Sequence, residues 1–175
     1  MCERLVVGSH ITLTSSLFST LSRSWASVAH LGHLSKTPRY QITALQNSSK
    51  ASAQAAADAY SLKDVSTYGN SSDLVADDEV DIVAVAVKVP MHDALLRPAI
   101  LAGKDVFCEW PLGRNLKEAT ELVEFARDHG VRTMIGLQAR QDPAMIKAKE
   151  IVASGKIGNV MGVVMYGHVS GSRGV

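Results

Sequence analysis

Cysteines and aromatic residues are scarce in this sequence, and both shortages exclude classes of protein. Among 175 residues there are two cysteines, Cys2 and Cys108, and only 5% are Phe, Trp or Tyr. Because Cys2 lies at the terminus and Cys108 within an apolar stretch, a disulfide between them is not expected, which favours a reducing compartment such as the cytoplasm. A thiol in so apolar a setting is also a poor nucleophile. The few aromatic rings give no platform for stacking nucleic-acid bases.

Strong charge and long apolar runs are missing too. The net charge is +1 at pH 7 and no dense basic patch is present, so nucleic acid is not expected as a direct partner. No apolar run is long enough to span a bilayer, and no metal site is expected. The remainder, 46% hydrophobic and 20% charged residues, is the composition of a globular domain that buries a real core.

Acidic residues are absent between positions 4 and 57. Residues 11–27 are instead rich in Ser and Thr, a profile that resembles a mitochondrial transit peptide, the minor possibility, and also fits a poorly specified terminus. Both interpretations stay open, and residues 1–24 are expected to form a poorly defined N-terminal segment. Within it, Leu5–Gly8 is a candidate first strand.

The stretch from residue 81 to residue 113 organises the rest of the chain. A β-branched apolar run ends before Pro90, a helical segment follows as far as Gly103, and a second apolar run ends before Pro111. This order predicts two buried parallel strands joined by a crossover helix. Because ligands collect at the carboxyl ends of such strands, we expect a small-molecule site where Pro90 and Pro111 lie side by side.

Strand and helix alternate through the other parts of the sequence as well. Asn115 and Asp142 are suited to begin helices, with Glu118 and Pro143 in the supporting positions. The alternation predicts an α/β fold with a doubly wound parallel sheet over residues 25–155. Further strands are predicted at 40–45, 65–68, 132–137 and 158–168, and further helices at 25–34, 50–60, 115–129 and 142–155.

Several motifs together resemble one family of oxidoreductases. G-K-D-V-F-C-E-W-P-L-G resembles the E-K-P segment of the glucose–fructose oxidoreductase/inositol dehydrogenase/MocA (Gfo/Idh/MocA) family. V-D-I-V-A-V-A-V-K-V-P-M-H, G-L-Q-A-R and A-K-E-I-V-A-S-G-K-I-G-N-V follow the family order. The spelling E-W-P-L-G with Q-A-R-Q-D-P-A is most similar to the fungal branch that contains the galactose regulator Gal80. The resemblance implies a Rossmann domain that binds NAD or NADP.

The resemblance also implies which residues contact the dinucleotide. Residues after the second strand take the adenosine-ribose positions, although Ser48 or Ser49 can equally be a helix cap. No acidic residue follows that strand and Lys50 lies nearby, so NADP is as open as NAD. His92 by itself would be interpreted as a surface or capping residue. The implied cofactor contacts are Asn47, Ser48, Ser49, Val89, Pro90, His92, Glu109, Trp110, Pro111, Gln138 and Arg140, with Glu109 on the nicotinamide ribose.

Two departures from the family pattern bear on activity. Trp110 replaces the family lysine that orients or protonates the substrate oxygen, so no catalytic residue is assigned. Its indole can stack on the nicotinamide, fill the pocket or serve the core, and the family motif implies a cis bond before Pro111. The glycine-rich turn after the first strand is also absent, because no glycine lies between Gly8 and Gly32. Either that phosphate-binding loop is rebuilt or the start of the domain is missing or replaced.

Three functions stay open from the sequence. The first is hydride transfer to or from a sugar-like or polyol substrate, with Glu109 and His92 positioning the dinucleotide. The second is a non-enzymatic, Gal80-like regulator that binds a protein partner and acts in the nucleus, and the third is an inactive fragment. Family members continue into a second α/β domain. Residues 156–175 are expected to hold only its first strand, whose unpaired edge would favour self-association, as in a truncated family member.

Overall fold

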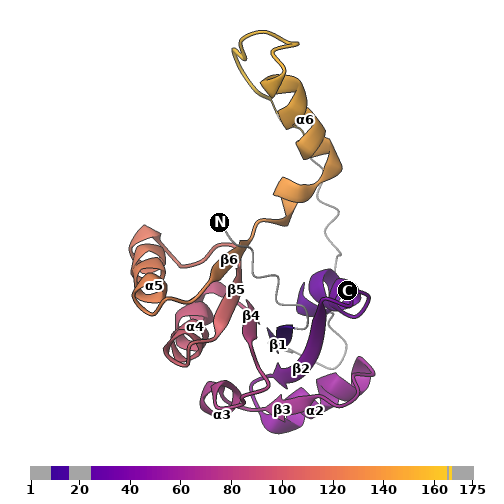
Figure 1. Ribbon diagram of the computed structural model, residues 1–175, viewed down its shortest axis with the longest axis vertical. Coiled ribbons are helices and arrows are strands. Elements are labelled where there is room, and N and C mark those ends of the chain that lie inside the picture. Colours follow the sequence, from indigo (N-terminus) through magenta and orange to yellow (C-terminus); the bar gives the residue numbers. More distant parts are fainter. Residues whose placement is uncertain (1–8, 16–24, 165, 167–175) are drawn as a thin grey trace. The chain divides into compact units, whose positions relative to one another are not determined.

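The structure, a computed structural model, describes residues 9–15, 25–164 and 166. It divides into two compact units, Met1–Gly136 and Leu137–Val175. The first unit contains a six-stranded parallel sheet with helices on both faces (Figure 1). No helix among the described residues is long and apolar enough to cross a membrane.

The sheet has the strand order β3-β2-β1-β4-β5-β6, and every neighbouring pair is parallel. The doubly wound parallel sheet predicted from the alternation is therefore confirmed. The chain reverses its winding direction between β1 and β4, which lie side by side at the centre. The strands are β1 (Ser9–Ser15), β2 (Tyr40–Gln46), β3 (Ser66–Tyr68), β4 (Ile82–Ala86), β5 (Asp105–Glu109) and β6 (Thr133–Gly136).

The central strand β1 lies within the segment that the sequence left poorly defined. It pairs with β2 on one side and β4 on the other. The candidate first strand at Leu5–Gly8 lies outside the described residues, as does the connection at 16–24 between β1 and the first helix.

Helices pack on both faces of the sheet, as the crossovers of a doubly wound fold require. One face carries α3, α4 and α5 (Figure 1), and the other carries η1, α1 and α2. The helical elements of this unit are the π-helix η1 (Ala26–Leu31), α1 (Gly32–Leu34), α2 (Lys50–Ala59), α3 (Ser71–Val75), the 3-10 helix η2 (Val89–Met91), α4 (His92–Leu101) and α5 (Leu116–Asp128).

Alternate residues of the central strands supply two hydrophobic cores. Val83 and Val106 contribute to the core beneath α3, α4 and α5, where Leu96 is also fully buried. Ala84 belongs to the core on the opposite face, under α1 and α2. Because successive side chains of a strand point to opposite faces, continuous apolar runs such as that of β4 are what a sheet covered on both sides needs.

Side-chain caps fix the beginnings of the helices. Ser49 Oγ accepts from Ser52 N at 3.1 Å and Ser52 Oγ accepts from Ser49 N at 3.1 Å, which forms a capping box before α2. Asn115 Oδ1 accepts from Glu118 N at 3.0 Å before α5. The predicted cap at Asn115 is confirmed, and Ser49 is the cap that the sequence left open.

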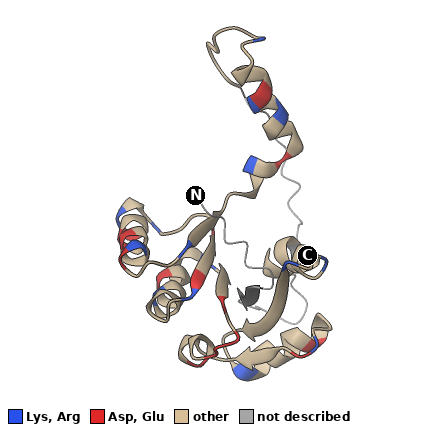
Figure 2. Ribbon diagram, viewed as in Figure 1, with Lys and Arg blue, Asp and Glu red and all other residues tan. Residues whose placement is uncertain are grey.

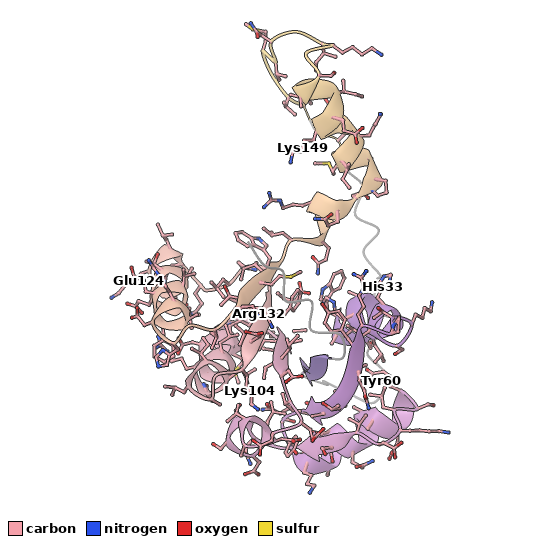
Figure 3. The ribbon with its side chains drawn as sticks, viewed as in Figure 1. His33, Tyr60, Lys104, Glu124, Arg132 and Lys149 are labelled. Carbon is pink, nitrogen blue, oxygen red and sulfur yellow. The ribbon has the colours of Figure 1, made fainter. Side chains whose placement is uncertain are left out.

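Ion pairs and hydrogen bonds tie the amino edge of the sheet together. The acidic run between α3 and β4, red in Figure 2, contains Asp77, whose carbonyl oxygen accepts from Lys104 Nζ at 2.9 Å. Arg132, labelled with Lys104 in Figure 3, donates from Nε to Asp105 Oδ2 at 2.7 Å. These charges lie at the amino ends of β4, β5 and β6, so they are remote from the edge where a ligand is expected.

The second unit contains the 3-10 helix η3 (Gln138–Gln141) and α6 (Pro143–Ala153). The predicted cap at Asp142 is confirmed, since its Oδ1 accepts from Ala144 N at 2.8 Å. The strand predicted at 158–168 is wrong for residues 158–164, which form no strand, while 165, 167 and 168 lie outside the described residues. A strand needs a neighbour for its backbone groups, and the described part of this unit offers none.

Candidate functional site

The parallel sheet brings the predicted strand ends to one edge. β4 and β5 are neighbours in register, with Val85 opposite Cys108. Pro90 lies just beyond the end of β4 and Pro111 just beyond the end of β5, so the prediction that neighbouring parallel strands carry them is confirmed. Asn47 follows β2 at the same edge. The carboxyl edge of the first unit is therefore the candidate site.

His92 lies inside the protein, beneath the two loops that follow β4 and β5. Its side chain is 1% exposed, with Nε2 3.1 Å from the Val87 carbonyl oxygen and Nδ1 3.1 Å from the Leu112 carbonyl oxygen. Nδ1 is also 3.2 Å from Cys108 Sγ. A neutral imidazole donates from one nitrogen only, so one of the two carbonyl oxygens accepts a hydrogen bond from the ring. His92 is therefore buried and not a surface residue, and it links the two loops. Its predicted contact with the cofactor stays a prediction.

Cys108 is a core thiol rather than a nucleophile. Burial raises its pKa from the ordinary 9.0 to about 12, and the neighbouring Glu109 charge acts in the same direction. We therefore expect a Cys2→Ser variant to react slowly with a thiol reagent at pH 8 when folded and rapidly in denaturant. The protonated thiol contributes stability below pH 9 that is lost as pH rises toward about 12. Fast labelling without denaturant would contradict this assignment.

Glu109 is held by residues from three elements. Its Oε1 accepts a hydrogen bond from His30 Nε2 on η1, and the imidazole meets the Phe107 ring edge-on, with 5.2 Å between the ring centroids. On β6, a Cβ added to Gly136 would lie 3.1 Å from Glu109 Oε2. Sequence reasoning proposed Glu109 but missed His30 and Gly136.

Trp110 projects from the edge instead of packing in the interior. Its side chain is 64% exposed, which excludes the core role among the three interpretations. The bond between Trp110 and Pro111 is cis, as the motif implied. Gly113 lies close against α5, where an added Cβ would be 3.0 Å from the Glu118 Cβ. An exposed indole next to Glu109 is suited to contact a planar ligand.

The loop after β2 is ordered by its own polar groups. Asn47 is 5% exposed and its Oδ1 accepts from Ser48 N at 2.8 Å, while Ser48 and Ser49 are exposed at the beginning of α2. Gly69, which follows β3, lies against this same turn, because an added Cβ would be 2.6 Å from Lys50 N. A ribose contact by these residues stays a prediction.

Gln138 and Arg140 belong to η3 in the second unit, and both are exposed. Their predicted contact with the pocket therefore stays a prediction.

Comparison with known proteins identifies relatives of two kinds. Residues 24–137 match the GFO_IDH_MocA family, described as an oxidoreductase family with an NAD-binding Rossmann fold. Dehydrogenase aclE of Aspergillus oryzae is 43% identical over 131 residues, which are 73% of this chain and 36% of that protein. The galactose/lactose metabolism regulatory protein GAL80 of Saccharomyces cerevisiae is 25% identical over 154 residues, or 84% of this chain and 35% of that protein. The chain thus spans little more than a third of these relatives.

Solved structures agree with the fold. An NAD binding oxidoreductase from Klebsiella pneumoniae superposes with a TM-score of 0.69 at 32% identity, covering 86% of this chain and 40% of that one. A super-repressor mutant of Gal80p from Saccharomyces cerevisiae gives a TM-score of 0.77 at 23% identity, covering 87% of this chain and 40% of that one. The second likeness shows the fold alone.

Proposed function

Because the chain belongs to the Gfo/Idh/MocA oxidoreductase family, we propose that its first unit binds a nicotinamide dinucleotide along the carboxyl edge of the sheet. The observation that carries this proposal is the strand order, which reverses between β1 and β4. In doubly wound sheets, dinucleotides lie across the crevice at that reversal. The loops after β2, β4 and β5 would then contact successive parts of one ligand.

The residues present fit such a ligand. Exposed Ser48, Ser49 and Lys50 lie at the beginning of the ten-residue helix α2, where backbone N–H groups and a cation favour the adenosine half. Val89 and Pro90 lie beyond β4 and would border the nicotinamide half. Asn47 stabilises the turn, because its Oδ1 accepts from Ser48 N.

At the other end, Glu109 and Trp110 would meet the nicotinamide nucleoside. A carboxylate accepts from ribose hydroxyls, and an exposed indole stacks on a planar ring. His92 would act indirectly, by holding the Val87 and Leu112 carbonyls and thereby the two loops. When bound, the dinucleotide supplies hydride exchange at its nicotinamide ring.

We further propose that the whole protein is an oxidoreductase of sugar-like or polyol substrates. The 43% identity to a dehydrogenase supports an enzyme. Trp110 cannot exchange a proton at neutral pH, because an indole N–H only donates. The proton must therefore come from a group other than the residue at the family lysine position.

A binding titration tests the cofactor proposal. We expect NADH or NADPH to bind the purified full chain, seen as a change in nicotinamide fluorescence and a raised melting temperature. A nucleotide at a hundred times its Kd stabilises the fold by about 2.7 kcal/mol. Lys50→Ala should weaken NADPH and spare NADH if Lys50 faces a 2′-phosphate. No response to either nucleotide would overturn the proposal.

A second candidate is a Gal80-like regulator that binds a protein partner without turnover. Two observations favour it, the Trp110 side chain at the family lysine position and the 25% identity to GAL80. A turnover assay with a panel of sugars and polyols distinguishes the two functions. Oxidation of any member of a sugar and polyol panel supports the enzyme. Nucleotide binding with no turnover on the panel supports the regulator.

A further inference from the structure

A hydrogen bond joins two residues that are 79 positions apart in the sequence at the candidate site. His30 Nε2 on η1 contacts Glu109 Oε1 at the end of β5, and their side chains are only 15% and 13% exposed. The imidazole is itself fixed, because it meets the Phe107 ring at 78°. Both partners lie in the first unit, and Glu109 directly precedes the exposed Trp110 in the sequence.

The other side of the carboxylate is equally confined. A Cβ on Gly136 would lie 3.2 Å from Glu109 Cδ and 3.0 Å from the far end of the Phe107 ring. The absence of a side chain at Gly136 therefore leaves room for the Glu109 carboxylate. A glutamate with rotatable bonds is held in one place by a donor on one side and a close backbone on the other.

We propose that His30 is a positioning residue, which presents the Glu109 carboxylate to the nicotinamide ribose of the bound dinucleotide. This inference rests on the proposed function, because it concerns the same site. A flexible carboxylate loses rotamer freedom when it binds, and a partner that fixes it beforehand removes that cost. His30 donates to Oε1 and thereby directs the carboxylate toward the carboxyl edge.

The expected effect is specific to one half of the ligand. ADP lacks the nicotinamide ribose, so its binding does not depend on Glu109. His30→Ala should weaken NADH binding roughly tenfold, the loss of one charge-assisted hydrogen bond, and leave ADP binding unchanged. His30→Gln should recover part of the NADH affinity, because the glutamine amide can donate to the same oxygen. If His30 only stabilised the fold, its replacement would lower the affinities for NADH and for ADP by the same factor.

The test is a fluorescence and calorimetric titration of the full chain and its variants with NADH and with ADP. Glu109→Ala should show the same selective loss, and the double variant should lose no more than either single one. Gly136→Ala leaves the His30 side chain in place but crowds the Glu109 carboxylate and the Phe107 ring, so it should reproduce the selective loss if His30→Ala fails to fold.

The outcomes separate the two proposals. If the unaltered chain binds neither NADH nor NADPH, the proposed function fails and this inference fails with it. If the unaltered chain binds NADH but the ratio of NADH to ADP affinity is the same in His30→Ala, only the positioning role is overturned. Additive losses in the double variant would also overturn it, because they would show that the two residues act separately.

Discussion

Replacing His92 by alanine is expected to lower the free energy of unfolding by about 3–5 kcal/mol. The side chain is 1% exposed, so its removal leaves a cavity in the core beneath α4. It also removes the ring N–H that donates to the carbonyl oxygen of Val87 or of Leu112. An orphaned buried acceptor costs its desolvation, and that cost adds to the cavity.

Urea unfolding followed by circular dichroism measures this loss as a lower midpoint at an unchanged slope. His129→Ala is the matched control, because that imidazole also contacts a carbonyl oxygen, Phe125 O at 2.8 Å, but is exposed at the end of α5. The control should change stability by no more than about 0.5 kcal/mol. Equal losses in the two variants would contradict the role assigned to His92.

The loss at His92 should extend to the site. The imidazole connects the loop that contains Pro90 with the loop that contains Pro111, so both become less ordered when it is removed. The affinity of the His92→Ala variant for NADH or NADPH is then expected to fall even where the variant stays folded. His92 would thus affect ligand binding without touching the ligand, by keeping the two loops in place.

Local features of this fold were predictable from the sequence because their causes are local. Asn115 and Asp142 begin helices through bonds to backbone groups three or fewer residues away, so the capping pattern is visible in the chain itself. The apolar run of β4 likewise predicts a strand covered on both faces. Cys108 was correctly placed in the core for the same reason, as a member of an apolar strand.

The central strand was missed because its pattern also fits another kind of segment. β1 reads S-H-I-T-L-T-S, in which apolar and hydroxyl residues alternate, and a transit-peptide profile has the same composition. Pairing with β2 and β4 on both sides defines this strand. The alternation permits a strand, but which strands it pairs with is a property of the assembled sheet.

The candidate site was predictable only in part, for a similar reason. Glu109 follows from a motif, but its partner His30 lies 79 residues away and no spacing rule connects them. The sequence around Gly136 and Gly69 does not show why each must be glycine. The reason is that the fold brings other atoms close to the place where a Cβ would lie. Sequence patterns identify the groups, and the tertiary structure decides which of them meet.

Replacing Gly69 by alanine is the second large effect that we expect, a loss of about 3 kcal/mol. The new Cβ would lie 2.6 Å from Lys50 N and 3.1 Å from the Ser49 carbonyl carbon. Both are backbone atoms, so no flexible side chain can move aside. The turn after β3 or the beginning of α2 must shift, and a shift of α2 breaks the capping box between Ser49 and Ser52.

Gly32→Ala is the matched control for this variant. Nothing lies within 4 Å of a Cβ added there, and the residue has helical φ of −63°. Alanine should therefore be neutral or stabilise by up to about 1 kcal/mol. Urea unfolding of the two variants compares the same chemical change at a crowded and an open position.

The Gly69→Ala variant also reports on the adenosine half of the proposed site. Because the displaced atoms belong to the turn that holds Ser48 and Ser49, ADP affinity should fall, whereas His30→Ala leaves it unchanged. A Gly69→Ala variant as stable as Gly32→Ala would show that β3 does not approach α2 as described. A destabilised variant with full ADP affinity would instead place the adenosine away from the beginning of α2.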